Sequence, residues 1–236
     1  RFENALKKHC ENLGINLINE ASVHDLELAK NDSLVLFRKR GETHSLKAKW
    51  LVDASGRASL LKRKLGLAKS IKHNINAAWF RIAVKINVNN WSEDEEWKKR
   101  NEYDRYLSTN HLYGKGYWTW LIPLSSGSTS IGIVADESIH SYQTINTFDR
   151  AREWLKKHEP QCSEMVENNI NSFQDFHSLK HFSFSCKKLY SEDGWCLTGD
   201  AGMFLDPLYS PGSDFVGINN GFITDIISKY LQGQNI

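Results

Sequence analysis

The 236-residue chain has little of what marks several classes of protein. Its 4 prolines lie in no repeat or Pro-rich stretch, which argues against long disordered segments. Its four cysteines, Cys10, Cys162, Cys186 and Cys196, form no C-x-x-C pair, so we expect no disulfide scaffold and predict a reducing compartment, the cytoplasm. No apolar run approaches 18 residues, so no transmembrane segment is expected. The formal net charge is only +2, which predicts no nucleic-acid partner.

What the chain does contain favours a mixed fold, α/β or α+β. Apolar residues make up 40%, enough for a sizeable core, and helical and strand patterns mix without an internal repeat. Because the chain starts at Arg1 inside a helical pattern and without Met, we expect it to be a piece of a longer protein. The predicted helices are 2–13, a helix closed by Gly66, 92–100, 148–158 and 217–231, with 161–180 helical or irregular. The predicted strands are 15–18, 34–38, 44–47, 50–52, 77–88, 117–123, 128–134, 181–189 and 195–197.

The first motif with chemical content is the stretch 50–59, WLVDASGRAS. A buried strand ends in the carboxylate of Asp53, small residues follow, and a helix begins. In nucleotide-binding α/β folds the ligand lies beyond the carboxyl ends of the strands, and helix N-termini favour anions. The alternative is an ordinary strand–turn–helix in which Asp53 or Ser55 caps the helix. The basic run Lys62-Arg63-Lys64 in this helix is expected to be solvated.

The second motif is the stretch 194–212, in which a short apolar strand again ends in Gly-Asp. Its spacing, Gly-Asp-Ala to Asp-Pro to Ser-x-Gly, is much more specific than the Gly-Asp pair alone. A carboxylate at Asp200 can accept hydrogen bonds from polyol hydroxyls. The turn through Gly212 leads into a helix whose N–H groups can face an electron-rich ring edge.

The third motif is Trp118-Thr119-Trp120-Leu121-Ile122-Pro123, which matches W-x-W-x-I-P at every specified position. On a strand the two tryptophans share one face and can form an apolar wall, although a core strand of a sheet is the alternative. With the other two motifs, this stretch resembles the flavin-dependent halogenases, a branch of the flavoprotein monooxygenase superfamily. The resemblance covers nearly the whole chain. It also argues against a geranylgeranyl-reductase-like flavoprotein, which shares the FAD motifs but not W-x-W-x-I-P.

The resemblance implies an FAD-dependent oxidoreductase built from part of an FAD-binding domain and an inserted substrate-domain sheet covered by helices. The implied domains are 1–70 and 191–236 for FAD binding, and 71–190 for the substrate domain. Asp200 would bind the ribityl chain, and Trp118 and Trp120, with Pro123, would separate flavin from substrate. The remaining residues that the resemblance assigns to the cofactor are Asp53, Ala54, Gly56, Gly199, Pro207, Ser210, Pro211 and Gly212.

Two parts of the family pattern are absent from the sequence. The family begins with a βαβ unit carrying G-x-G-x-x-G, and its catalytic lysine would lie upstream of Arg1, so no catalytic residue is assigned here. We therefore expect residues 1–236 alone to retain FAD weakly or not at all.

The turn after Asp-Pro bears on halogenation. The family holds its halide with backbone N–H groups in this turn, and proline at Pro211 has none. Losing such a donor in a dry site costs roughly 1.5–3 kcal/mol. The tryptophan halogenases carry Glu where this sequence has Tyr209, so free tryptophan is not the expected substrate.

The sequence therefore predicts a halogenase-like monooxygenase that acts on an electron-rich aromatic or polyketide-like small molecule through a flavin C4a-hydroperoxide. A flavin reductase or NAD(P)H would supply the electrons. Two alternatives stay open: a true flavin-dependent halogenase, and an inert fragment of a flavoprotein fold that serves as a binding module. No metal is expected, because the pair His177 and His181 has no third ligand at suitable spacing.

Overall fold

The computed structural model describes residues 2–234, which divide into two compact units. Within this range the first unit consists of residues 2–69, 186–203 and 207–234, and the second of residues 70–185 and 204–206. Each unit has its own hydrophobic core. The predicted boundaries at 70/71 and 190/191 lie one and five residues from those of these units, and residues 204–206 belong to the second unit. None of the helices in the described range combines the length and apolar content that a bilayer span requires.

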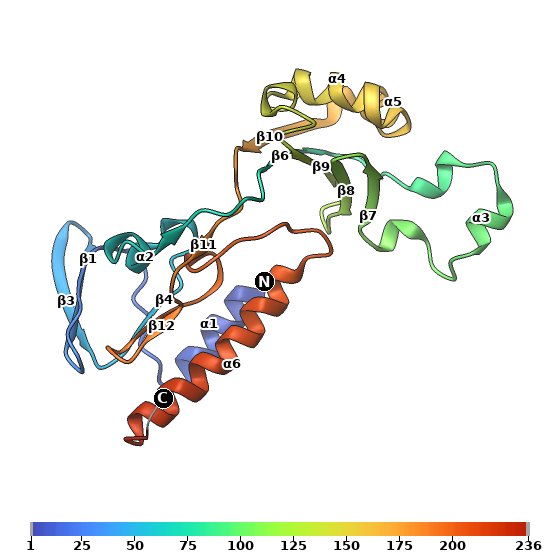
Figure 1. The fold of residues 1–236 in the computed structure, drawn as a ribbon. Coiled ribbons are helices and arrows are strands. Elements are labelled where there is room, and N and C mark those ends of the chain that lie inside the picture. The colour runs from blue at the N-terminus through green and yellow to red at the C-terminus, as the bar shows by residue number, and fades with distance from the viewer. Residues whose placement is uncertain (1, 235–236) are drawn as a thin grey trace. The chain divides into compact units, whose positions relative to one another are not determined.

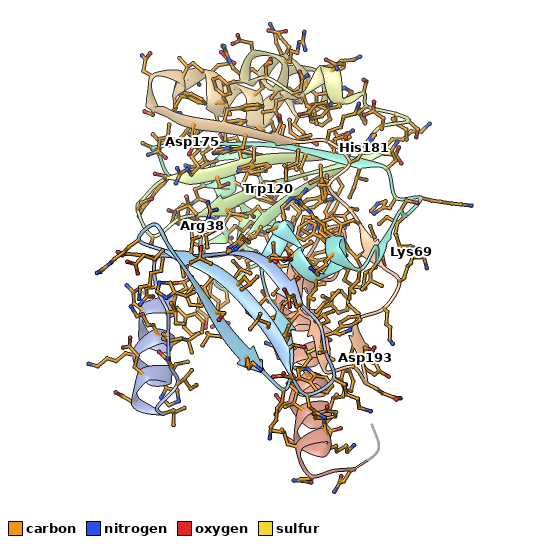
Figure 2. All side chains as sticks on the ribbon, turned by 90° about the vertical axis from the view of Figure 1, so that its left-hand side faces the viewer. Arg38, Lys69, Trp120, Asp175, His181 and Asp193 are labelled. Atoms are coloured by element: carbon orange, nitrogen blue, oxygen red, sulfur yellow. The ribbon has the colours of Figure 1, made fainter. Side chains whose placement is uncertain are left out.

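The first unit contains two three-stranded sheets (Figure 1). One is an antiparallel meander, β1–β2–β3; the other is β12–β13–β4, in which β13 and β4 run parallel. Arg38 and Asp193 mark these two sheets in Figure 2. The bounds are α1 Phe2–Asn12, β1 Ala21–Glu27, β2 Ser33–Lys39, β3 Glu42–Ala48, β4 Leu51–Asp53, η1 Gly56–Ala58, α2 Leu60–Lys64, β5 Ala68–Lys69, β12 Tyr190–Ser191, β13 Trp195–Leu197, η6 Gly199–Ala201 and α6 Pro211–Leu231.

The second unit is a five-stranded antiparallel sheet, in the order β10–β6–β9–β8–β7, with α4 and α5 over one face (Figure 1). Phe80, Leu121 and Ile133 lie in the core beneath the helices with Trp154 and Leu155 of α4. The bounds are β6 Ile75–Ile82, η2 Val88–Trp91, α3 Glu95–Lys99, η3 Arg105–Leu107, β7 Asn110–Gly114, β8 Tyr117–Pro123, β9 Thr129–Asp136, η4 Tyr142–Thr144, α4 Phe148–His158, α5 Pro160–Asn168, η5 Ile170–Ser172, β10 Phe173–Leu179 and β11 Ser185–Cys186.

Several predicted elements are wrong in extent or type. Residues 15–18 form no strand, and the strand predicted over 77–88 ends at Ile82. The strand predicted over 181–189 is reduced to the two-residue β11. The final helix begins six residues before the predicted Gly217, at Pro211. Proline suits the first position of a helix, because its fixed φ is already helical and no helical hydrogen bond needs its N–H.

Candidate functional site

The turn after β4 is organised by the Asp53 carboxylate. Asp53 is 6% exposed. Its Oδ1 accepts the Ser55 N–H at 2.9 Å, and its Oδ2 accepts the Leu61 N–H at 2.8 Å. Ser55 Oγ accepts the Leu60 N–H at 3.2 Å. These bonds are those of the capping alternative, so the carboxylate shapes this turn through its own backbone.

The turn at Gly199-Asp200 lies beside the turn that follows Asp53. Because β13 pairs parallel with β4, the carboxyl ends of both strands meet at one edge, and the Thr198 N–H donates to the Asp53 carbonyl at 3.0 Å. The turn η6 contacts η1, α2 and α6. Among the described residues the Asp200 carboxylate has no hydrogen-bond or ion-pair partner. This edge therefore combines two turns of small residues with one half-buried, unpartnered carboxylate.

A buried lysine ties these two motifs together. Lys62 of α2 is 6% exposed, and its Nζ donates to the Gly202 carbonyl at 3.1 Å. Burial lowers the pKa of this lysine. The expectation that the whole run Lys62–Lys64 is solvated is therefore wrong at its first member. The reason is the position of Lys62 in α2. It follows the core residue Leu61, and both side chains are buried in this helix of only five residues.

The N-terminus of α6 completes this edge. The Ser210 N–H donates to the Pro207 carbonyl at 2.8 Å, and Tyr209 and Ser210 are both left-handed, with φ of 59° and 56°. Such strain in two consecutive non-glycine residues is typical of functional turns. Pro211 follows as the first helical residue, and an added Cβ at Gly212 would meet no atom within 4 Å.

Two asparagines that the sequence patterns did not single out anchor α6 at this edge. The Asn219 amide donates to the Leu197 carbonyl at 2.9 Å, and the Thr198 hydroxyl donates to the Asn220 amide oxygen at 2.7 Å. Their only signal in the sequence is an Asn-Asn pair inside a predicted helix, where asparagine is a poor helix former. These two bonds hold the middle of α6 against the end of β13.

The W-x-W-x-I-P strand is β8 of the second unit. Trp118 and Trp120 lie on the sheet face opposite the helices, with ring centroids 5.6 Å apart and planes tilted by 45°. Trp118 is 7% exposed, and its Nε1 donates to Asp206 Oδ1 at 3.1 Å. Asp206 in turn lies 3.8 Å from His73 Nε2. Pro123 ends the strand.

His111 of β7 contacts this tryptophan pair. Its ring meets that of Trp118 edge-on, with centroids 5.4 Å apart. Burial alone lowers the pKa of His111, which keeps the imidazole neutral at pH 7. His111 therefore adds an uncharged ring to the aromatic residues on this face of the sheet. No motif in the sequence pointed to His111, which becomes visible only through the pairing of β7 with β8.

The two histidines considered as metal ligands do not share a helix. His177 lies in β10, and His181 follows the strand with a left-handed φ of 45°. Within residues 2–234, no three side chains of His, Cys, Asp or Glu come together as a metal site.

The comparisons with known proteins identify the family. The sequence model of the tryptophan halogenase family matches residues 1–228. The chain belongs to this family. It is 28% identical over 240 residues to the 1H-pyrrole-2-carbonyl-[peptidyl-carrier protein] brominase of Pseudoalteromonas luteoviolacea, covering 99% of this chain and 55% of that protein. It is 27% identical over 197 residues to the flavin-dependent halogenase chlA of Dictyostelium discoideum, covering 80% of this chain and 32% of that protein.

The solved structures agree with this family. The structure of the flavin-dependent brominase Bmp2 matches with a TM-score of 0.79 and 25% identity, over 99% of this chain and 56% of that chain. The mixed α/β fold of the tryptophan halogenase family, with part of an FAD-binding-type fold, is thereby confirmed. The chain spans about a third to about half of the length of the curated relatives it matches first.

Proposed function

We propose that the protein containing this chain is an FAD-dependent oxidoreductase of the halogenase-like type that oxygenates an electron-rich small molecule. The observation that carries this proposal is the edge where β4 and β13 end side by side, with two glycine-containing turns and the unpartnered Asp200 carboxylate. Ligands of α/β sheets bind at such edges. Membership of the tryptophan halogenase family supports a flavin as that ligand.

The residues of the first unit fit FAD. The Asp200 carboxylate is an acceptor for ribityl hydroxyls, and Gly56 and Gly199 have positive φ, which keeps both turns tight and free of side chains. Ala54 extends the first turn, and Asp53 would act indirectly, because its two oxygens already hold that turn. The residues proposed to lie near the flavin ring are Pro207, Ser210, Pro211 and Gly212.

When bound and reduced, FAD supplies the activation of O₂, and the chain supplies binding, orientation and exclusion of water. We assign the exclusion of water to Trp118 and Trp120, together with Pro123. The burial of Trp118 and the neutral imidazole against its ring support this assignment, while the Asp206 carboxylate fixes the edge of the same indole. No general acid or base among the described residues is assigned.

The substrate class and the partners are proposed from the membership of the chain in the tryptophan halogenase family. The relative from Pseudoalteromonas luteoviolacea acts, by its name, on a pyrrole-2-carbonyl group attached to a peptidyl carrier protein. An electron-rich aromatic or polyketide-like ring is accordingly the proposed substrate class, with a flavin reductase or NAD(P)H as electron source. The proposed location is the cytoplasm, consistent with the four free cysteine thiols.

True halogenation is the second candidate, because the matched relatives are named halogenases, a brominase and a chlorinase. Two features at the start of α6 weigh against it. Pro211 provides no N–H at the first helical position, and Asp214 places a carboxylate in the first turn, where it opposes an anion. Oxygenation without halide is therefore the preferred reaction.

The test is the absorption spectrum of the protein purified from the intact gene, with the released chromophore identified. We expect bound FAD, and we expect Asp200→Asn to lose most of it. Asp225→Asn is the matched control, because Asp225 lies in the same unit on α6, where it pairs with Lys229 at 2.7 Å. A colourless protein that takes up no added FAD would overturn the enzyme assignment and leave a binding module.

A further inference from the structure

On the sheet face that bears the tryptophans in the second unit, five residues form a row, one from each strand. The pairing register places Trp79 of β6 opposite Gly132 of β9, and Gly132 opposite Trp120 of β8. The same row continues to His111 of β7 and to His177 of β10. Four of its five members carry aromatic rings, and the central one, Gly132, carries no side chain. Trp120 lies near the centre of this sheet in Figure 2.

The Trp120 indole occupies the space that a side chain at position 132 would need. A Cβ built on Gly132 would lie 2.0 Å from Cζ2, 2.2 Å from Cε2 and 2.3 Å from Cη2 of the indole. Ordinary contact distances for a Cβ are 3.4–4 Å. The indole therefore lies directly on the backbone of β9, in space that any other residue at position 132 would occupy.

A hydrogen bond fixes the same ring in its plane. Trp120 Nε1 donates to Ser130 Oγ at 3.2 Å. Ser130 precedes Gly132 by two residues on β9, so both point to the same face of the sheet. One strand thus supplies a surface beneath the ring and an acceptor at its edge.

We propose that Gly132 and Ser130 are positioning residues that hold Trp120 flat against β9 and so set the aromatic wall of W-x-W-x-I-P. This inference rests on the proposed function for the wall's purpose, the exclusion of water from the flavin. The placement of the ring itself is independent of any flavin. Position 132 is the more sensitive of the two, because a single methyl group there displaces the indole by more than 1 Å and breaks its bond to Ser130.

The same sheet provides a matched control. A Cβ on Gly114 of β7 would meet the ring of Tyr117 at 2.2–2.4 Å, a contact of the same kind and severity. Tyr117, however, packs against the core under the helices, on the opposite face from Trp120. Gly132→Ala and Gly114→Ala therefore impose similar strain on one sheet, but only the first displaces the tryptophan wall.

The test is circular dichroism of the full-length protein, measured without FAD. Two indoles 5.6 Å apart and tilted by 45° couple excitonically, and the difference spectrum between the wild type and Trp120→Phe isolates the Trp118–Trp120 signal. We expect Gly132→Ala to lose most of this signal, Ser130→Ala to lose part of it, and Gly114→Ala to keep it. With FAD reduced and O₂ added, the first two variants should release H₂O₂ several-fold faster than Gly114→Ala.

An unchanged signal in Gly132→Ala, or equal losses in Gly132→Ala and Gly114→Ala, would overturn the proposal. If Gly132→Ala does not fold, Ser130→Ala decides: a reduced signal supports the proposal and an unchanged one overturns it. A protein that binds no FAD would refute the proposed function, while the flavin-free spectra would still judge the positioning of Trp120.

Discussion

Both carboxylate oxygens of Asp53 accept backbone N–H groups within the turn that follows β4. Hydrogen bonds to a charged group contribute about 1.5–3 kcal/mol each, and loss of a cap about 0.5–2 kcal/mol. We expect Asp53→Ala to lower the free energy of unfolding by about 2–4 kcal/mol in urea denaturation, and Asp53→Asn by less. The control is Asp32→Ala, an exposed carboxylate paired with Lys47, which should change stability by less than about 1 kcal/mol. Equal effects of Asp53→Ala and Asp32→Ala would contradict the capping role.

Glu159, at the end of α4, predicts a pH dependence. Burial raises its pKa, although the Tyr117 hydroxyl donates to it at 2.8 Å, and burial beside this carboxylate raises the pKa of Tyr117 to about 12. Because the pKa of Glu159 is higher folded than unfolded, its ionised form opposes folding near pH 7. That cost disappears as the pH falls through the folded pKa toward the unfolded value.

Glu159→Gln should therefore raise the free energy of unfolding relative to the wild type most at pH 7, and less as the pH falls through pH 5.5 to pH 4.5, near the ordinary pKa of a glutamate. The glutamine still accepts from Tyr117, so the hydrogen bond is retained. Urea denaturation at the three pH values measures the difference. A difference that stays constant across this range would mean that burial does not perturb Glu159.

At the scale of elements, the prediction from sequence succeeded for two alternating strands and an amphipathic helix, and it failed for an isolated apolar segment and for a polar edge strand. The strands at 117–123 and 128–134 form the hairpin β8–β9, and 148–158 is α4. The edge strand β10 was missed, because its sequence FQDFHSL places the polar Asp175 and His177 on the face away from the helices. Its strand state comes from pairing with β6, which no local pattern encodes.

The start of α6 was also misplaced, and this difference bears on halide binding. Since the helix begins at Pro211, a substitution to Thr restores one N–H among the first-turn donors without removing any helical bond. We expect Pro211→Thr to leave the free energy of unfolding within about 0.5 kcal/mol of the wild type. We expect it also to raise halide affinity by about tenfold to a hundredfold, from the roughly 1.5–3 kcal/mol of a charged hydrogen bond.

Product analysis with reduced FAD, O₂ and bromide measures the second effect in the full-length protein. Ser213→Thr serves as the control, since it adds no backbone donor in the same turn. Halogenated product formed by the wild type at low bromide would show that Pro211 does not limit the reaction.

At the scale of the whole molecule, the two units have separate cores, one around Phe80 in the sheet unit and one around Leu61 in the other. Phe80 is 0% exposed and Leu61 1% exposed, so truncation to Ala should cost about 3–5 and about 2–5 kcal/mol respectively. Because the two residues share no core, the double variant should lose the sum of the two single effects to within about 0.5 kcal/mol. Chemical denaturation of the single and double variants gives this sum, and a strong deviation would mean that the two cores are coupled.

The residues proposed to bind the cofactor could be singled out from sequence because they lie in motifs, where small residues and carboxylates follow short apolar strands. The contacts that arrange those motifs were not found. Lys62 reaches Gly202 across 140 positions, and Trp118 reaches Asp206 across 88. Such contacts depend on the pairing of distant strands, which a single sequence read along its length does not specify.

The position of Pro211 also has an evolutionary consequence. The first position of a helix accepts proline or a hydrogen-bonding residue at nearly equal folding stability. Selection for a stable fold therefore does not act against a single codon change at this position. On the halide argument made above, exchange of Pro211 for a hydrogen-bonding residue therefore changes anion binding while the fold stays stable. It follows from the same argument that the residue at position 211 says more about halide binding than resemblance over the whole chain does.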